Sequence, residues 1–229
     1  AGAISVGQYG ELCVYDYHGA STVFSGNSAS KYGGALKIES MAKSRVNNAI
    51  FKGNSAQWGG AVALYGKEGK TATTYFNGCT FGGTEEGEGN HATHRGGAMY
   101  LEDESYANLV DCSLIGNHSV NNGGAICVEG WEKLCVFRSS FIGNYGASGG
   151  AIYTDSGTNG NYADLFIDEC SFDANYITDR WGTTMNINGI DHFCMHNSSI
   201  RGSYNKANQS GDKASWVAMD VVQEYTSIS

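Results

Sequence analysis

The sequence contains no proline, few positive charges and no long apolar run. Lys and Arg number 14 against 23 Asp and Glu, which gives a formal net charge of −9. We therefore expect no nucleic-acid partner, because no basic surface is available to neutralise phosphates. No run of about 18 apolar residues occurs, so we expect no membrane-spanning helix and no membrane insertion. The 3.6-residue periodicity of amphipathic helices is also missing.

Glycine, by contrast, is abundant, with 33 of 229 residues, and much of it belongs to a repeated motif. Gly-Gly-Ala begins at Gly33, Gly59, Gly96, Gly123 and Gly149, and a degenerate copy begins at Gly182. Successive copies are 26, 37, 27, 26 and 33 residues apart. A second motif, an aromatic or aliphatic residue three positions before an asparagine, precedes most copies: Phe24/Asn27, Phe51/Asn54, Leu114/Asn117, Phe141/Asn144 and Phe172/Asn175. Self-similarity of this kind indicates a solenoid.

Apolar residues alternate with variable ones after each glycine pair, as at Leu36 and Ile38. A period of two is typical of strands, and a unit of about 26 residues cannot bury its apolar face alone. We therefore predict an all-β fold, a right-handed parallel β-helix of about seven coils. We expect residues 1–229 to form a single domain of this kind. Because open coils expose unpaired strand edges, we expect a segment of a longer protein, with further coils or a partner packed at the ends.

Stacked coils would align the recurring asparagines into a structural ladder at one corner. We expect this ladder to consist of Asn27, Asn54, Asn117, Asn144 and Asn175. Asparagine tolerates the left-handed conformation that a corner requires, and it can hydrogen-bond to the next coil. In the copy that begins at Phe81, Thr84 stands in the asparagine position and a longer acidic loop follows.

The seven cysteines show no paired metal-ligand spacing and no disulfide framework. Cys79, Cys112 and Cys170 occupy a column of small residues, so we interpret them as buried space-filling thiols. A single bridge between Cys127 and Cys135 is the alternative. His91 and His94, in a loop with three glutamates, form a weak candidate for a transition-metal site, and a solvated surface loop is the other interpretation.

Carboxylates recur at the outward position five residues after the second glycine. Glu102, Glu129 and Asp155 would lie about 5 Å apart on consecutive coils. Oxygen ligands at that spacing form a candidate site for Ca²⁺, and a solvated acidic face is the alternative.

Aromatic residues recur around the same glycine pairs. Tyr32, Trp58 and Trp181 directly precede them, and Tyr100 and Tyr153 occupy outward positions three residues after the second glycine. Exposed rings on a flat β-surface can stack on sugars. The alternative is that they cover strand edges or pack under neighbouring loops.

Phe-x-x-Asn followed by Gly-Gly-Ala and an apolar residue resembles the repeat of the chlamydial polymorphic outer membrane proteins. Similar repeats occur in adhesin-like right-handed β-helix proteins of other bacteria, including gut Bacteroidetes. The resemblance covers roughly residues 20–190. It implies a secreted or surface-displayed bacterial protein that binds a host surface or a glycan.

These observations predict a secreted or cell-surface adhesin-like protein that binds polysaccharide or host glycan through an extended face, without catalysis. One alternative is a polysaccharide lyase or glycoside hydrolase of the pectate-lyase-like group, since that fold also supports enzymes. Another is a structural spacer. No Arg or Lys shares the acidic column, and the column therefore lacks the base that a lyase needs.

Overall fold

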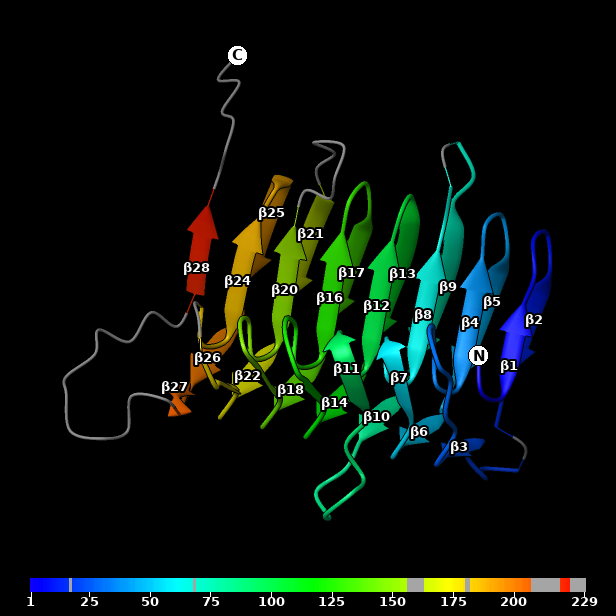
Figure 1. The fold of residues 1–229 in the computed structure, drawn as a ribbon, viewed down its shortest axis with the longest axis horizontal. Coiled ribbons are helices and arrows are strands. Elements are labelled where there is room, and N and C mark those ends of the chain that lie inside the picture. Colours follow the sequence, from blue (N-terminus) through cyan, green and yellow to red (C-terminus); the bar gives the residue numbers. More distant parts are fainter. Residues whose placement is uncertain (17, 68, 156–162, 180–181, 207–218, 223–229) are drawn as a thin grey trace.

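The computed structural model describes residues 1–16, 18–67, 69–155, 163–179, 182–206 and 219–222. The strands of this part of the chain form four parallel sheets with eight, seven, seven and six strands, which wind around one core. Neighbouring strands in each sheet come from successive coils, as Figure 1 shows. The predicted all-β parallel solenoid is therefore confirmed. From β1 to β24 the described chain completes about six turns, and β28 pairs with β24 beyond them.

We number the sheets in the order in which a coil passes through them. Sheet 1 contains β1 (Ile4–Val6), β4 (Leu36–Glu39), β8 (Val62–Tyr65), β12 (Met99–Glu102), β16 (Ile126–Glu129), β20 (Ile152–Asp155), β24 (Met185–Asn188) and β28 (Met219–Val222). Sheet 2 contains β2 (Glu11–Val14), β5 (Lys43–Asn47), β9 (Ala72–Asn77), β13 (Ser105–Val110), β17 (Lys133–Phe137), β21 (Ala163–Asp168) and β25 (Ile190–His196). Sheet 3 contains β3 (Val23–Ser25), β6 (Ile50–Lys52), β10 (Thr80–Gly82), β14 (Ser113–Ile115), β18 (Ser140–Ile142), β22 (Ser171–Asp173) and β26 (Ser199–Arg201). Sheet 4 contains β7 (Ser55–Trp58), β11 (His91–Arg95), β15 (His118–Ser119), β19 (Tyr145–Gly146), β23 (Tyr176–Ile177) and β27 (Tyr204–Asn205).

The asparagine ladder lies at the corner between sheets 3 and 4. The side-chain amide of Asn54 donates to Asn90 Oδ1 at 2.9 Å, and that of Asn90 donates to Asn117 Oδ1 at 2.8 Å. Each interior asparagine also donates to the carbonyl of the apolar residue one coil earlier, as Asn117 does to Phe81 O at 2.9 Å. The ladder runs through six residues: Asn27, Asn54, Asn90, Asn117, Asn144 and Asn175.

Two details of the ladder differ from the prediction. Asn90, not Thr84, completes it, because residues 83–88 form an insertion between the apolar residue and its asparagine. Five of the six ladder asparagines follow a residue with positive φ, as at Gly53 (φ 60°) and Gly116 (φ 62°), and none of the six is itself left-handed. The asparagines are therefore retained for hydrogen bonding to the adjacent coils.

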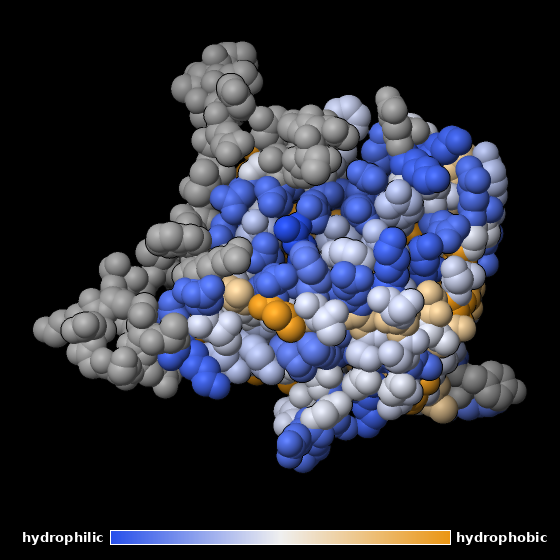
Figure 2. All heavy atoms as spheres, viewed as in Figure 1, coloured by the Kyte–Doolittle hydropathy of each residue, from blue (hydrophilic) through white to orange (hydrophobic). Residues whose placement is uncertain are grey.

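The interior is filled by columns of similar side chains. Phe24, Phe51 and Phe81 stack with ring centroids 4.7 and 4.9 Å apart, and Phe141 stacks on Phe172 at 4.6 Å. Cys79, Cys112 and Cys170 are buried in the column of small residues, as expected, and all seven cysteines are free thiols. Figure 2 shows that the outer face in this view is mostly hydrophilic.

The Gly-Gly pair forms the corner between sheets 4 and 1. A Cβ on Gly97 would lie 2.1 Å from the carbonyl oxygen of Gly124 on the next coil, and Gly96 has φ +68°. Backbone from consecutive coils meets here without room for a side chain, which explains the repetition of the motif. No helix within the described residues is long and apolar enough to cross a membrane.

Candidate functional site

Tyr32 and Trp58 lie side by side at the glycine corner, on adjacent coils. Their backbones are bridged in parallel, and their rings stack with centroids 5.1 Å apart. Both side chains are half-buried. Tyr65 and Tyr100 pack near Tyr32, with centroid distances of 6.0 and 6.4 Å, and His94 lies 5.5 Å from Trp58. The ring faces therefore pack largely on one another.

Charged groups border these rings on the next two coils. Arg95 follows Trp58 in the same column, and its Nη1 lies 2.6 Å from Glu129 Oε2. The Tyr100 hydroxyl donates to the same carboxylate oxygen at 2.6 Å. Burial raises the pKa of Glu102 to about 7, although hydrogen bonding with the Tyr32 hydroxyl acts in the opposite direction. We call this set the aromatic–acidic face: Tyr32, Trp58, Tyr65, Arg95, Tyr100, Glu102 and Glu129.

The other predicted aromatic residues are placed differently from the expectation of an exposed platform. Tyr100 points outward from sheet 1 but is only 3% exposed, because neighbouring rings and Glu129 cover it. Tyr153 is half-buried, and its hydroxyl donates to Asp155 Oδ2 at 3.2 Å. Trp181 lies outside the described residues.

Glu102, Glu129 and Asp155 are neighbours on three consecutive strands of sheet 1, β12, β16 and β20. Each is close to a protein donor: Tyr32 beside Glu102, Arg95 and Tyr100 beside Glu129, and Tyr153 beside Asp155. Among the described residues, no group of three or more His, Cys, Asp or Glu is arranged to hold a metal ion. The column can accept hydrogen bonds from a ligand at its exposed edges.

His91 and His94 lie on strand β11 rather than in the loop where the sequence analysis placed them. His91 begins a column of stacked rings on the outside of sheet 4, formed by the residues that follow the last four ladder asparagines and by Tyr204, which pairs with Tyr176. Its ring stacks on His118 at 4.2 Å, and His118 stacks on Tyr145 at 4.8 Å. Tyr176 and Tyr204 continue the column at 4.8 and 4.7 Å. Burial lowers the pKa of His118 to about 4, so its imidazole is neutral at pH 7.

This aromatic column was missed in the sequence analysis. Its signal is the position after each asparagine, which reads Ser28, Ser55, His91, His118, Tyr145 and Tyr176. The residue type changes along the chain, so no single repeated letter marks the position. All five rings of the column are half-buried, which leaves their edges accessible.

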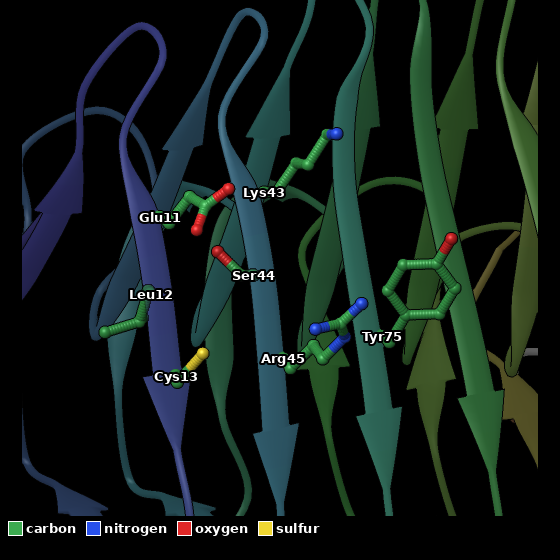
Figure 3. Close-up of a pocket in the computed structure, with 7 residues that line it drawn as sticks. All are labelled: Glu11, Leu12, Cys13, Lys43, Ser44, Arg45 and Tyr75. Carbon is green, nitrogen blue, oxygen red and sulfur yellow. The ribbon is translucent and has the colours of Figure 1, made fainter.

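Two hollows open on the outer face of sheet 2. The first, of about 160 Å³, lies over β2, β5 and β9, where Lys43 and Arg45 project from β5 (Figure 3). Arg45 pairs in register with Cys13 and Tyr75, and Lys43 with Glu11. It is a small, mixed-charge depression. The second, of about 360 Å³, lies where the turns from sheet 1 enter sheet 2, and Trp131 and Tyr106 line it.

Comparison with known proteins identifies the repeat. Residues 21–39, 111–129 and 138–155 each match the model of the Chlamydia polymorphic membrane protein (Chlamydia_PMP) repeat. Each segment runs from a strand of sheet 3, with the apolar–asparagine motif, to the strand of sheet 1 that follows the glycine pair, and the second and third segments also contain a strand of sheet 4. No curated protein and no solved structure matches the chain. The chain therefore contains Chlamydia polymorphic membrane protein repeats, folded as a parallel β-solenoid.

Proposed function

We propose that this chain is a secreted or cell-surface adhesin-like protein, and that its aromatic–acidic face binds glycan without catalysis. The observation that carries the proposal is the half-buried Tyr32–Trp58 stack beside the Arg95–Glu129 ion pair. The match to repeats of a polymorphic membrane protein supports a surface location.

The chemistry of this face suits a carbohydrate. Aromatic rims supply apolar contact, while the carboxylates and guanidinium offer acceptors and donors for hydroxyl groups. Because the rings stack on one another, a ligand meets their edges and the flanking charges rather than a free ring face. Contacts of this kind are individually weak, and repetition over several coils makes them additive.

An array of oligosaccharides, including acidic ones, tests this proposal. We expect the wild-type chain to bind a subset and Trp58→Ala and Tyr32→Ala to lose that binding. Tyr32→Phe keeps the ring and separates stacking from the contribution of the hydroxyl group. Tyr9→Ala is the matched control, since Tyr9 is 66% exposed and lies outside the face. Absence of wild-type binding would favour the structural spacer, and binding unaffected by the first two substitutions would contradict the assignment to the aromatic–acidic face.

A polysaccharide-cleaving activity is the second candidate, and one observation favours it. Glu102, with a pKa near 7, is adjacent in register to Glu129, whose carboxylate is held by Arg95. A carboxyl group whose pKa is raised towards neutrality, beside a second carboxyl group held by an arginine, supplies components of acid–base catalysis. Incubation with acidic polysaccharides, followed by reducing-end and unsaturated-product assays, decides between the two. Product formation that Glu102→Gln abolishes would replace the adhesin proposal.

A further inference from the structure

A hollow of about 280 Å³ opens where the first three coils turn from sheet 1 into sheet 2. The turns that follow β1, β4 and β8 lie side by side along this edge of the solenoid, at the top of Figure 1. The charged residues among the described lining are Lys37 and Glu39 from β4 and Lys67 and Lys70 from the turn after β8. Three lysines and one glutamate give this lining a formal charge of +2 in a chain of −9. We call it the lysine hollow.

Lys67 and Lys70 are opposed across a tight turn. The Lys67 amide donates to the Lys70 carbonyl at 3.2 Å, and the Lys70 amide donates to the Lys67 carbonyl at 2.7 Å, which forms an antiparallel bridge. Like charges directly opposite each other destabilise such a pair. Both residues are exposed, and neither forms an ion pair with another described residue. An anion between the two ammonium groups would relieve their repulsion.

The next coil holds the backbone on both sides of this pair. Glu104 Oε1 accepts the Gly69 amide at 2.8 Å, and the Gly66 amide donates to the Glu102 carbonyl at 3.0 Å. A Cβ on Gly66 would lie 1.9 Å from the Asp103 carbonyl oxygen, so the two coils are in close contact here. These contacts place the lysines before a ligand arrives, which lowers the entropy cost of binding.

Lys37 and Tyr65 join the lysine hollow to the aromatic–acidic face. The Lys37 ammonium lies 2.7 Å from Glu39 Oε1 and 5.8 Å from the Tyr32 ring centroid. Tyr65 lines the hollow, and its ring centroid lies 6.0 Å from that of Tyr32, which stacks on Trp58 at 5.1 Å. A continuous row of rings therefore leads from Trp58 at the glycine corner into the hollow.

Two uncharged donors accompany the lysines. Gln8, in the turn after β1, and Ser40, in the turn after β4, line the same hollow. Their amide and hydroxyl groups can donate to the oxygens of a carboxylate or a sulfate, as the ammonium groups do. Hydrogen bonds with an ionised partner are about twice as strong as those between neutral groups. The donor set therefore suits an oxyanion better than a neutral sugar hydroxyl.

The charge reverses along the following coils. Asp103 and Glu104 occupy the turn after β12, while Glu129 and Asp155 lie in the outward column that also contains Glu39 and Tyr65. These carboxylates repel an anion but accept hydrogen bonds from hydroxyl groups. A ligand with one anionic end is therefore oriented, with that end at the lysines and its hydroxyl groups over the later coils.

Building on the glycan-binding function proposed above, we propose that the ligand is an acidic oligosaccharide whose anionic group binds between Lys67 and Lys70. Gln8 and Ser40 donate to the same group, and the edge of Tyr65 contacts the sugar that carries it. A uronic acid and a sulfated sugar share this chemistry, and the experiment separates them.

Calorimetric titration of the full chain with two matched pairs of oligosaccharides is the test. One pair is oligogalacturonate and its methyl ester, and the other is a sulfated carrageenan oligosaccharide and its desulfated form. We expect at least one charged member to bind, its uncharged counterpart to bind about tenfold more weakly, and salt to weaken the complex. Binding of the galacturonate alone would identify a uronic acid, and binding of the carrageenan alone would identify a sulfated sugar.

Lysine variants locate the anionic group. Lys67→Gln and Lys70→Gln should each weaken binding of the charged oligosaccharide about threefold, the effect of losing one exposed ion pair. Lys70→Arg keeps the charge and should bind as wild type does. Lys133→Gln is the matched control, because Lys133 is an exposed lysine on β17 that lies outside both the hollow and the aromatic–acidic face.

The outcomes separate this proposal from the glycan-binding function. Equal binding of charged and uncharged members, or equal effects of Lys67→Gln and Lys133→Gln, would overturn the lysine hollow even if Trp58→Ala abolished binding. Binding that depends on Lys70 but not on Trp58 would support the anion site and contradict the glycan-binding face. Absence of binding to both charged oligosaccharides would overturn the proposal.

Discussion

Replacement of Asn117 by alanine removes four hydrogen bonds from the fully buried ladder. Asn117 Oδ1 accepts from the Asn90 amide nitrogen at 3.1 Å and from Asn90 Nδ2 at 2.8 Å. Asn117 Nδ2 donates to Phe81 O at 2.9 Å and to Asn144 Oδ1 at 3.0 Å. At about 1 kcal/mol net for each bond, the variant should lose about 4 kcal/mol of unfolding free energy. The loss of about 4 kcal/mol is a lower bound, because the variant also leaves the hydrogen-bonding groups of Asn90, Phe81 and Asn144 unsatisfied in a buried environment.

Asn27→Ala provides the matched control at the end of the ladder. Asn27 is partly exposed, and its side chain donates one bond to Asn54 Oδ1 at 2.9 Å. Its loss should cost about 1 kcal/mol. Urea unfolding, followed by circular dichroism under identical conditions, compares the two midpoints. If Asn117→Ala is no less stable than Asn27→Ala, the ladder does not hold the coils together and the reasoning is wrong.

Two further predictions concern the glycine corner and the buried acid. Gly97→Ala should prevent folding or strongly lower the melting temperature, because its Cβ meets the Gly124 carbonyl oxygen at 2.1 Å; Gly7→Ala, with nothing within 4 Å, should be neutral. Melting temperatures of both variants check this, and equal melting temperatures would contradict the close contact between the backbones at Gly97 and Gly124. Glu132→Gln should be more stable than wild type at pH 8 but not at pH 4. The pKa of the folded carboxyl group is raised to about 9, so wild-type stability falls as pH rises from the unfolded pKa. The difference in unfolding free energy between the two proteins should grow by about 4.5 kcal/mol from pH 4 to pH 8, and a difference that urea unfolding finds constant across the two pH values would contradict this.

Much of the fold could be predicted because each coil repeats the same solution to the same packing problem. Phe51 and Phe141 have to stack on neighbours from other coils, and the glycine pairs recur where backbones touch. Asn90 escaped prediction because an insertion separates it from Phe81, so that a fixed spacing from the apolar residue points to Thr84. Asn90 takes its place in the ladder through its position in the folded coil, and the inserted loop leaves that position unchanged.

The candidate sites could be predicted less fully, for two physical reasons. Alternation reveals which face a residue points to but not what covers it, and Tyr100 is outward yet buried. Columns also depend on register between coils of unequal length. The stack of His91, His118 and Tyr145 can be recognised only when the strands are paired. The same pairing is needed to see that Glu132 lies in a column of small residues. The paired register is therefore needed to locate both features.

Residues about one coil apart in sequence are vertical neighbours in register, and an engineered disulfide provides a direct test of that pairing. Ser113 and Ser140 are paired on sheet 3 with hydroxyl oxygens 3.2 Å apart, whereas Ser171 is one strand further. Ser113→Cys with Ser140→Cys should oxidise to a disulfide that mass spectrometry of tryptic peptides locates. Ser113→Cys with Ser171→Cys should not, because two strand spacings are about 9.6 Å. A bridge in the second variant but not in the first would contradict the stacking on which every proposed surface depends.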